Sequence, residues 1–468
     1  GYVSRVVAIR ESAYEVAAEL KETIPESGYV MTPPMELSNN PDRYEKYQDL
    51  HACIKSAVDL ATEAETTVGP RYRALADGQY ALSEGRHSES AGLANDADPS
   101  WTPEEVSVWW KLLSDSEREA LINKDPEKYG NLDGIDMASR AKANELVLLG
   151  PKDASGQHVP GAGLLGQAER DLAEAEAAMV GATSNLAALD LKRKQAQNRV
   201  DDLRALRDQM NVDGVTLVSL QPGKPGENVL AALAIGDVDN AEHVATMVPG
   251  MTTNCRDSAA LNLGYAYNLR EAAVRAGADK NNVATIAWLG YDAPPALPDL
   301  SVASTAQAEA GADPLRKFAT GIHSWRSERG MDVHQSIIPH SYGSTTAGIA
   351  MRSIGKDVVD DFAYTGSPGA GVASVGTLGV DKDHVWVSAV PHHDAVQGIG
   401  TDGNFGLDPK TLKGIGHLSG DASGAKDYST YSLNPVANHS SYFVAPEPGK
   451  QNHALNDLGK VIADAKER

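Results

Sequence analysis

Cysteine is nearly absent from this chain, which has only Cys53 and Cys255 among its 468 residues. Such scarcity argues against a disulfide framework, and neither cysteine has the C-x-x-C neighbour of a zinc site. Long apolar runs are missing as well. The chain contains no stretch of eighteen apolar residues, which is the length that a transmembrane helix needs. Residues Gly1 to Arg5 lack the basic-then-apolar pattern of a secretory signal. This slightly favours a cytoplasmic location and leaves association with the cell envelope open.

Basic residues are in deficit, since 64 acidic residues outnumber 42 basic ones and the net charge is −22. An acidic surface repels nucleic acid, so we expect no nucleic-acid partner. The length predicts more than one domain, and the composition changes near residue 212. Ala, Glu, Leu, Lys and Arg dominate before that point, whereas Gly, Pro, Val, Ser and His become common after it. We therefore predict a mainly α-helical domain over 1–211 and an α/β domain over 212–468.

Helical signals are strong throughout the first part. Helices are predicted over 1–24 and 42–86, on either side of a proline-rich break. Two capping boxes predict the starts of further helices, formed by Thr102 with Glu105 and by Ser114 with Glu117.

Small and apolar residues then recur at steps of three and four from Leu165 to Met210. Such heptads predict one long, coiled-coil-like helix over about 160–211. Its partner is either an earlier helix, such as the one over 42–86, or another subunit, and we favour an intramolecular hairpin.

From residue 213 onward, predicted strands alternate with predicted helices. A hairpin is expected where two apolar runs flank a turn rich in glycine and proline, over 215–220 and 229–234. Further strands are predicted over 244–248, 283–289, 333–338, 361–364 and 385–390, with helices over 256–276, 314–326 and 343–354. This alternation predicts a mostly parallel sheet flanked by helices.

Ser341 is the candidate nucleophile. It lies in Pro339-His340-Ser341-Tyr342-Gly343, between a predicted strand and a predicted helix. A serine on such a sharp turn is held out at the edge of the sheet, where the helix N-terminus helps to stabilise negative charge on its adduct. The G-x-S-x-G pattern is met at Gly343 but has Pro339 in place of its first glycine.

An acyl-transfer serine also needs donors for the developing oxyanion. One is expected to be the backbone N–H of Tyr342, directly after the serine. The other is expected from the loop that follows an earlier strand, at Met251, with Thr252 as the alternative.

An acid and a base are expected later in the chain, in the order Ser, Asp, His. Asp394 lies just past a predicted strand and is preferred to its rivals Asp402 and Asp408. The residues alone leave the base open among His417, His439 and His453. Adjacent residues on an extended segment point to opposite sides, so His392-His393-Asp394 does not predict a metal site. No phosphate-binding glycine loop follows a strand, and we expect no cofactor and no metal.

Several ordered motifs together resemble one family. They are Val248-Pro249-Gly250, Trp288-Leu289-Gly290-Tyr291, His340-Ser341-Tyr342-Gly343-Ser344, Gly366-Ser367-Pro368-Gly369 and His439-Ser440-Ser441-Tyr442. Over roughly 215–445 the chain resembles actinobacterial α/β-hydrolase domains of unassigned function, and the stretch from Trp109 to Ile135 resembles the helical region that often precedes them. The resemblance implies an α/β-hydrolase fold and a triad of Ser341, Asp394 and His439, which favours His439 over His417. The family usually has glycine where this chain has Pro339.

These observations together predict a serine hydrolase that acts on an ester or related acyl bond of a small-molecule or lipid-like substrate. One alternative is a weakly active or inactive hydrolase-fold protein with an interaction or regulatory role at the cell envelope. Another is acyl transfer by the same triad. In either case the helical arm could contact a protein partner or self-associate.

Overall fold

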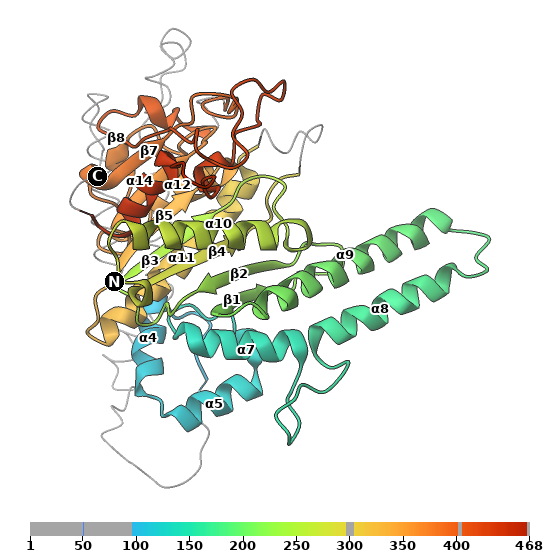
Figure 1. The fold of residues 1–468 in the computed structure, drawn as a ribbon. Coiled ribbons are helices and arrows are strands. Elements are labelled where there is room, and N and C mark those ends of the chain that lie inside the picture. The colour runs from blue at the N-terminus through green and yellow to red at the C-terminus, as the bar shows by residue number, and fades with distance from the viewer. Residues whose placement is uncertain (1–49, 51–95, 296–303, 401–404, 466–468) are drawn as a thin grey trace.

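The computed structural model of the chain describes Leu50 and residues 96–295, 304–400 and 405–465 (Figure 1). The helix predicted over 1–24 lies outside these residues, as does the helix predicted over 42–86 apart from Leu50. Asp402 lies outside them too. No helix in the described part of the chain combines the length and the apolar character needed to cross a membrane.

The described residues contain an eight-stranded sheet, in the order β1-β2-β4-β3-β5-β6-β7-β8. The pairs β1–β2 and β2–β4 are antiparallel, and all the other pairs are parallel. The strands are β1 (Val215–Gln221), β2 (Leu230–Ile235), β3 (His243–Val248), β4 (Val283–Leu289), β5 (His334–Pro339), β6 (Asp361–Thr365), β7 (Val385–Ser388) and β8 (Gly416–His417). The predicted hairpin and the mostly parallel sheet are thus confirmed.

Helices cover both faces of this sheet, as its parallel strands require. Val244 and Val248 of β3 belong to the hydrophobic cluster that includes α11 (Ala306–Glu328) and α12 (Tyr342–Met351). Ala245 and Met247 belong instead to the cluster with α10 (Cys255–Arg275) and α14 (His453–Ile462). Alternate residues of one strand therefore face different helix layers. Because both faces are covered, the central strands are buried along almost their whole length, and every residue of β4 and β6 is buried.

The described helical region before the sheet begins with α4 (Pro103–Leu112), α5 (Asp115–Lys124), α6 (Pro126–Tyr129) and α7 (Met137–Leu149). Both predicted capping boxes are present, at the starts of α4 and α5. Trp110 is fully buried, and its ring stacks on Tyr129 with the centroids 5.7 Å apart. The same cluster includes Trp325 of α11, so this region packs directly against a helix of the α/β part.

The prediction of one long helix over about 160–211 is wrong. The structure has α8 (Gly163–Met179) and α9 (Leu186–Met210), which pack side by side as an antiparallel hairpin (Figure 1). Gly181 and Asn185 in the connection have φ values of 74° and 57°, a left-handed conformation that ends a helix. The heptad pattern continued across the turn because each arm carries its own apolar stripe. The partner of α8 is therefore α9, in the same chain.

The base of this hairpin is anchored to the sheet. Leu165, Val200 and Leu203 share a hydrophobic cluster with strands β1 and β2 and with α10. The buried carboxylate of Asp202 in α9 pairs with Arg256 of α10 at 3.0 Å. The tip of the hairpin extends away from the sheet (Figure 1).

Candidate active site

Ser341 occupies the sharp turn between β5 and α12. Its φ of 56° and ψ of −134° lie in a region that non-glycine residues rarely adopt. The Ser341 N–H donates to Thr365 O at 3.0 Å, and the His340 N–H donates to Val248 O at 2.9 Å. These bonds tie the turn to strands on either side of β5 and hold the strained conformation. Ser341 is 3% exposed.

The two residues that flank this turn explain why it forms despite the departure from the family pattern. A Cβ at Gly343 would lie 2.4 Å from Val248 O, so the close approach of helix and strand requires glycine there. Pro339 is the last residue of β5, and its carbonyl oxygen still accepts a hydrogen bond from Thr365 Oγ1 at 2.7 Å. The first glycine of the pattern is thus not needed for this turn.

The loop after β3 lies directly against the serine. A Cβ placed on Gly250 would lie 2.8 Å from Ser341 Oγ and 3.1 Å from the Tyr342 nitrogen. Gly250 therefore keeps open the space in which an oxyanion would form. The Thr252 N–H already donates to Pro294 O at 2.7 Å, which makes Thr252 a poor oxyanion donor. Within the described residues, the Tyr342 and Met251 N–H groups make no such bond and remain the candidates.

Asp394 and His439, predicted as acid and base, are in direct contact. The His439 Nδ1 lies 2.7 Å from Asp394 Oδ1, and the Asp394 side chain is fully buried. The second carboxylate oxygen, Oδ2, accepts hydrogen bonds from the Tyr442 hydroxyl at 2.6 Å and from Gln397 Nε2 at 2.9 Å. Burial alone would raise the pKa of Asp394, but the bonds from His439, Tyr442 and Gln397 outweigh it and lower the pKa.

Asn438 fixes the acid loop to the base loop. This fully buried residue donates from its side chain to His392 O at 2.8 Å and to Ser429 O at 2.7 Å. Its backbone N–H donates to His393 O at 3.0 Å. The segment before Asp394 and the residue before His439 are thereby held in one arrangement. Asn438, Gln397 and Tyr442 were not predicted as site residues, because only their tertiary contacts reveal their part in the site.

The His439 ring faces the end of β6, next to the serine turn. A Cβ on Gly366 would lie 3.0 Å from His439 Cε1, and the residue before it, Thr365, accepts the Ser341 N–H. The His439 Nε2 is buried and has no hydrogen-bond partner among the described residues. Ser341 and His439 are thus neighbours around one strand end, but their side chains are not hydrogen-bonded to each other in this structure. Catalytic hydrogen bonds are often formed only when substrate is bound.

His340 supports His439 from the other side. Its Nε2 donates to His439 O at 2.7 Å, and the two ring centroids are 4.4 Å apart. Because the acceptor is a carbonyl oxygen, the proton of the neutral ring is on Nε2. Burial, with His439 close by, lowers the pKa of His340 to about 3. His340 therefore stays neutral and positions the backbone of the candidate base.

The rival residues lie elsewhere. Asp408 pairs with Lys410 at 3.3 Å, and His417 and His453 are exposed at the starts or ends of other elements.

In the part of the chain that the structure describes, one group of side chains is close enough to hold a metal ion, and it does not include the His392–Asp394 segment. Its potential ligand atoms, all within 4.8 Å of one another, belong to His334, Asp361 and Asp464. His334 and Asp361 already pair at 3.0 Å, at the edge of the sheet away from Ser341.

The strand order, the strained serine and the Asp394–His439 pair define an α/β hydrolase. Residues 224–401 match the family described as alpha/beta hydrolase. The uncharacterized protein Rv0963c of Mycobacterium tuberculosis is 35% identical over 231 residues, which cover 47% of this chain and 84% of that protein. The chain belongs to the α/β-hydrolase family. This agrees with the resemblance to actinobacterial members of unassigned function.

The chain is also similar to a longer mycobacterial protein and to solved structures of low sequence identity. The uncharacterized protein Rv2079 of Mycobacterium tuberculosis is 31% identical over 303 residues, which span 61% of this chain but only 42% of that longer protein. Among solved structures, a poly(3-hydroxybutyrate) depolymerase from Bordetella parapertussis has 13% identity and a TM-score of 0.25, covering 57% of this chain and 80% of its own. Aspergillus fumigatus lipase B has the same identity and TM-score, covering 73% of this chain and 89% of its own.

Proposed function

We propose that this α/β hydrolase is a serine hydrolase that cleaves an ester or related acyl bond of a small-molecule or lipid-like substrate. The 2.7 Å hydrogen bond between Asp394 and His439, beside a serine held at a φ of 56°, carries the proposal. This combination favours a serine with an activating base and an orienting acid.

In the first half of the reaction, the Ser341 Oγ attacks the carbonyl carbon while His439 Nε2 takes its proton. The N–H groups of Tyr342 and Met251 then stabilise the oxyanion. As the tetrahedral intermediate collapses, the bond to the leaving group breaks and His439 returns the proton to it. An acyl ester on Ser341 remains. In the second half, water attacks this ester with His439 as the base, and the acid product leaves.

The role of Asp394 follows from its surroundings. The hydrogen bonds that lower its pKa keep it ionised at neutral pH, so it accepts the Nδ1 proton of His439 and stabilises the imidazolium formed in the attack. Tyr442 and Gln397 position the carboxylate and do not contact the reacting atoms.

A fluorophosphonate probe tests the proposal, because an activated serine displaces fluoride and forms a stable phosphonyl ester. We expect the wild-type chain to be labelled and Ser341→Ala not to be labelled. Ser344→Ala is the matched control, since Ser344 lies one helical turn away, is fully buried and should leave labelling unchanged. Labelling that persists in Ser341→Ala would refute the nucleophile. An unlabelled wild type would refute the hydrolase activity and favour an interaction role.

A further inference from the structure

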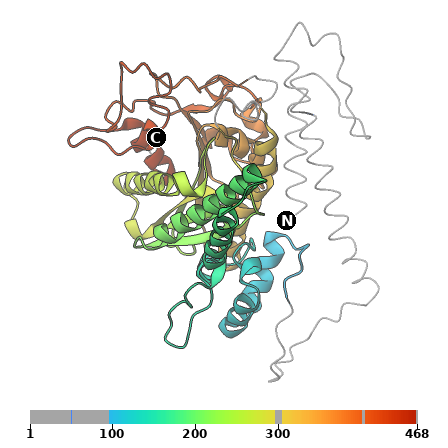
Figure 2. The same ribbon diagram turned by 90° about the vertical axis from the view of Figure 1, so that its right-hand side faces the viewer.

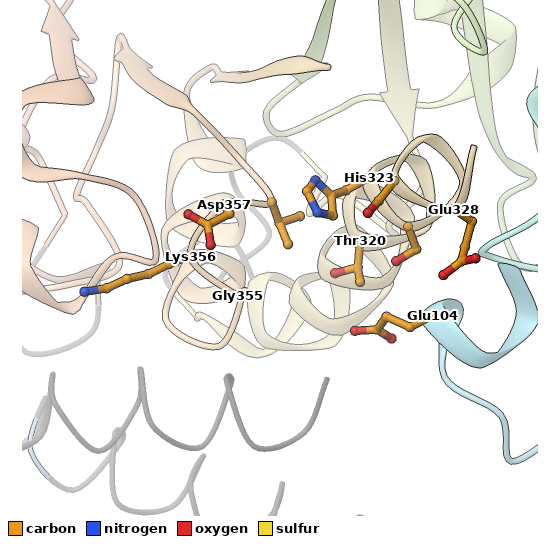
Figure 3. Close-up of a pocket in the computed structure, with 10 residues that line it drawn as sticks. Glu104, Thr320, His323, Glu328, Gly355, Lys356 and Asp357 are labelled. Atoms are coloured by element: carbon orange, nitrogen blue, oxygen red, sulfur yellow. The ribbon is translucent and has the colours of Figure 1, made fainter. Parts of the chain in front are cut away.

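A second site lies at the other edge of the sheet. A partly open cavity of about 270 Å³ is lined by α4, by the C-terminal half of α11 and by the loop 355–358 (Figure 3). The end of α11 leads into the start of β5, and the loop leads into the start of β6. Ser341 and Asp394 follow the opposite, C-terminal ends of β5 and β7, and the His439 ring lies at the same end of β6. Since the strands are parallel, this cavity is separate from the candidate active site.

Three buried polar atoms that line this cavity have no hydrogen-bond partner in the part of the chain that the structure describes. Thr320 and Ser324 are 2% and 4% exposed, and neither hydroxyl forms a hydrogen bond among the described residues. The same holds for Glu104 Oε2. Thr320 and Ser324 are one turn apart on α11 and both line the cavity. Proteins rarely leave buried polar groups unsatisfied, so three such atoms around one cavity point to an occupant.

The charge around the cavity is negative. Glu104, Glu328 and Asp357 contribute carboxylates to its lining, and of these Glu328 also pairs with Lys111 at 3.7 Å. The one lining residue with a fixed positive charge is Lys356, whose amine is directed away from His323 in Figure 3. Burial lowers the pKa of His323, and the strongest charge effects on it come from acids, among them Asp357 and Glu104 of the cavity lining. A ligand with a positive charge fits this environment best.

Among the described residues, no three acidic or histidine side chains that line this cavity lie close enough together to hold a metal ion. Within the described residues, only the His334, Asp361 and Asp464 group brings three potential ligand atoms within 4.8 Å. An organic cation that carries its own hydroxyl groups can interact with Glu104 and also satisfy the hydroxyls of α11. The cavity is near the lower limit of about 300 Å³ for small-molecule pockets, so the occupant must also be small.

We propose that this cavity binds a small organic cation with hydroxyl groups, such as a protonated amino alcohol or amino sugar. Its ammonium group interacts with Glu104, and its hydroxyl groups hydrogen-bond to Thr320 and Ser324. Because the site is formed by α4 and α11 together, an occupant also stabilises the contact between the helical region and the α/β part.

Three polyols with the same six-carbon chain test the ligand class on the full chain: N-methylglucamine, uncharged sorbitol and anionic gluconate. Isothermal titration calorimetry should detect binding of N-methylglucamine, with sorbitol at least tenfold weaker and gluconate not bound. Binding of none of the three means that the cavity holds only water, and this refutes the proposal. Gluconate binding as tightly as N-methylglucamine refutes the charge argument.

Variants locate the site. Glu104→Gln should weaken the binding of N-methylglucamine at least tenfold, because it removes the negative charge and keeps the shape of the side chain. Glu119→Gln is the matched control, since Glu119 is an exposed acid of the same helical region that does not line the cavity. Thr320→Val removes only a hydroxyl without a partner, so it should weaken binding while the chain still folds.

The proposal does not depend on the proposed hydrolase activity. Ser341→Ala should bind N-methylglucamine as the wild type does, and loss of binding in this variant would place the ligand in the active site instead. Unchanged affinity in both Glu104→Gln and Thr320→Val would show that the ligand binds elsewhere and refute the assignment.

Discussion

Lowering the pH from 7.5 to 5.0 is expected to cost the folded chain about 2 kcal/mol of stability through His340 alone. The pKa of His340 is about 3 in the folded chain, against 6.5 for an ordinary histidine. Between these values the unfolded chain binds a proton that the folded chain does not. The contribution of His340 is therefore fully present above about pH 6.5 and is lost as the pH falls toward 3.

The magnitude follows from the ordinary pKa. At pH 5.0 the histidine of the unfolded chain lies about 1.5 pH units below its pKa, while His340 in the folded chain is still neutral. Each unit corresponds to about 1.4 kcal/mol, which gives about 2 kcal/mol in total. The cause is structural, because the 7% exposed ring lies against His439 and is buried without a neighbouring carboxylate in hydrogen-bond contact.

His340→Gln isolates this effect. The glutamine amide can still donate to His439 O but does not titrate. Urea unfolding of both proteins at pH 7.5 and 5.0 should show a loss about 2 kcal/mol smaller in the variant, because all other titrations cancel in the comparison. His453→Gln, which replaces an exposed histidine, should behave as the wild type. Equal losses in wild type and His340→Gln would refute the reasoning.

Three further substitutions test the site. Gly250→Ala places a methyl group 2.5 Å from Ser341 Cβ and 2.8 Å from Ser341 Oγ, so the serine turn must shift. The variant should be labelled by fluorophosphonate about 100-fold more slowly and should unfold at a lower temperature than the wild type. Wild-type labelling would contradict the open space assigned to Gly250. Tyr442→Phe removes the hydroxyl that donates to Asp394. It should lower the free energy of unfolding in urea by about 2–4 kcal/mol. A loss below about 0.5 kcal/mol, as for a surface substitution, would show that the Tyr442–Asp394 hydrogen bond is unimportant. Gly343→Ala places a methyl group 2.4 Å from Val248 O. It should lower the midpoint of thermal unfolding and abolish labelling. A variant as stable as the wild type would refute the close approach of α12 to β3.

Most of the α/β part could be predicted from local patterns. Buried parallel strands are continuous apolar runs, and β4 is predicted and observed over Val283–Leu289. The capping boxes at Thr102 and Ser114 were also predicted correctly, because a capping box depends on two residues three positions apart. The α8–α9 hairpin was missed since apolar periodicity continues on both sides of the turn at Gly181. The seven-residue repeat therefore predicted one continuous helix, although a glycine lies within it.

The candidate site was predictable to a lesser degree. Ser341 could be found because its turn depends on adjacent residues, and Asp394 because catalytic groups follow strand ends. His439 could be separated from His417 only through the family resemblance. In space the separation is clear, because His439 contacts Asp394 and His417 is exposed on β8.

By itself, the sequence determined what depends on short spacings: the order of strands and helices, the serine turn and the scarcity of cysteine. Tertiary structure alone decided which distant residues meet. It brought Asp394 into contact with His439 and Tyr442, and it formed two helices where one was predicted. It also left the hydroxyls of Thr320 and Ser324 without hydrogen-bond partners among the described residues. The physical reason is that periodicity and caps act over a few residues, whereas burial and hydrogen-bond partners depend on segments far apart in the chain.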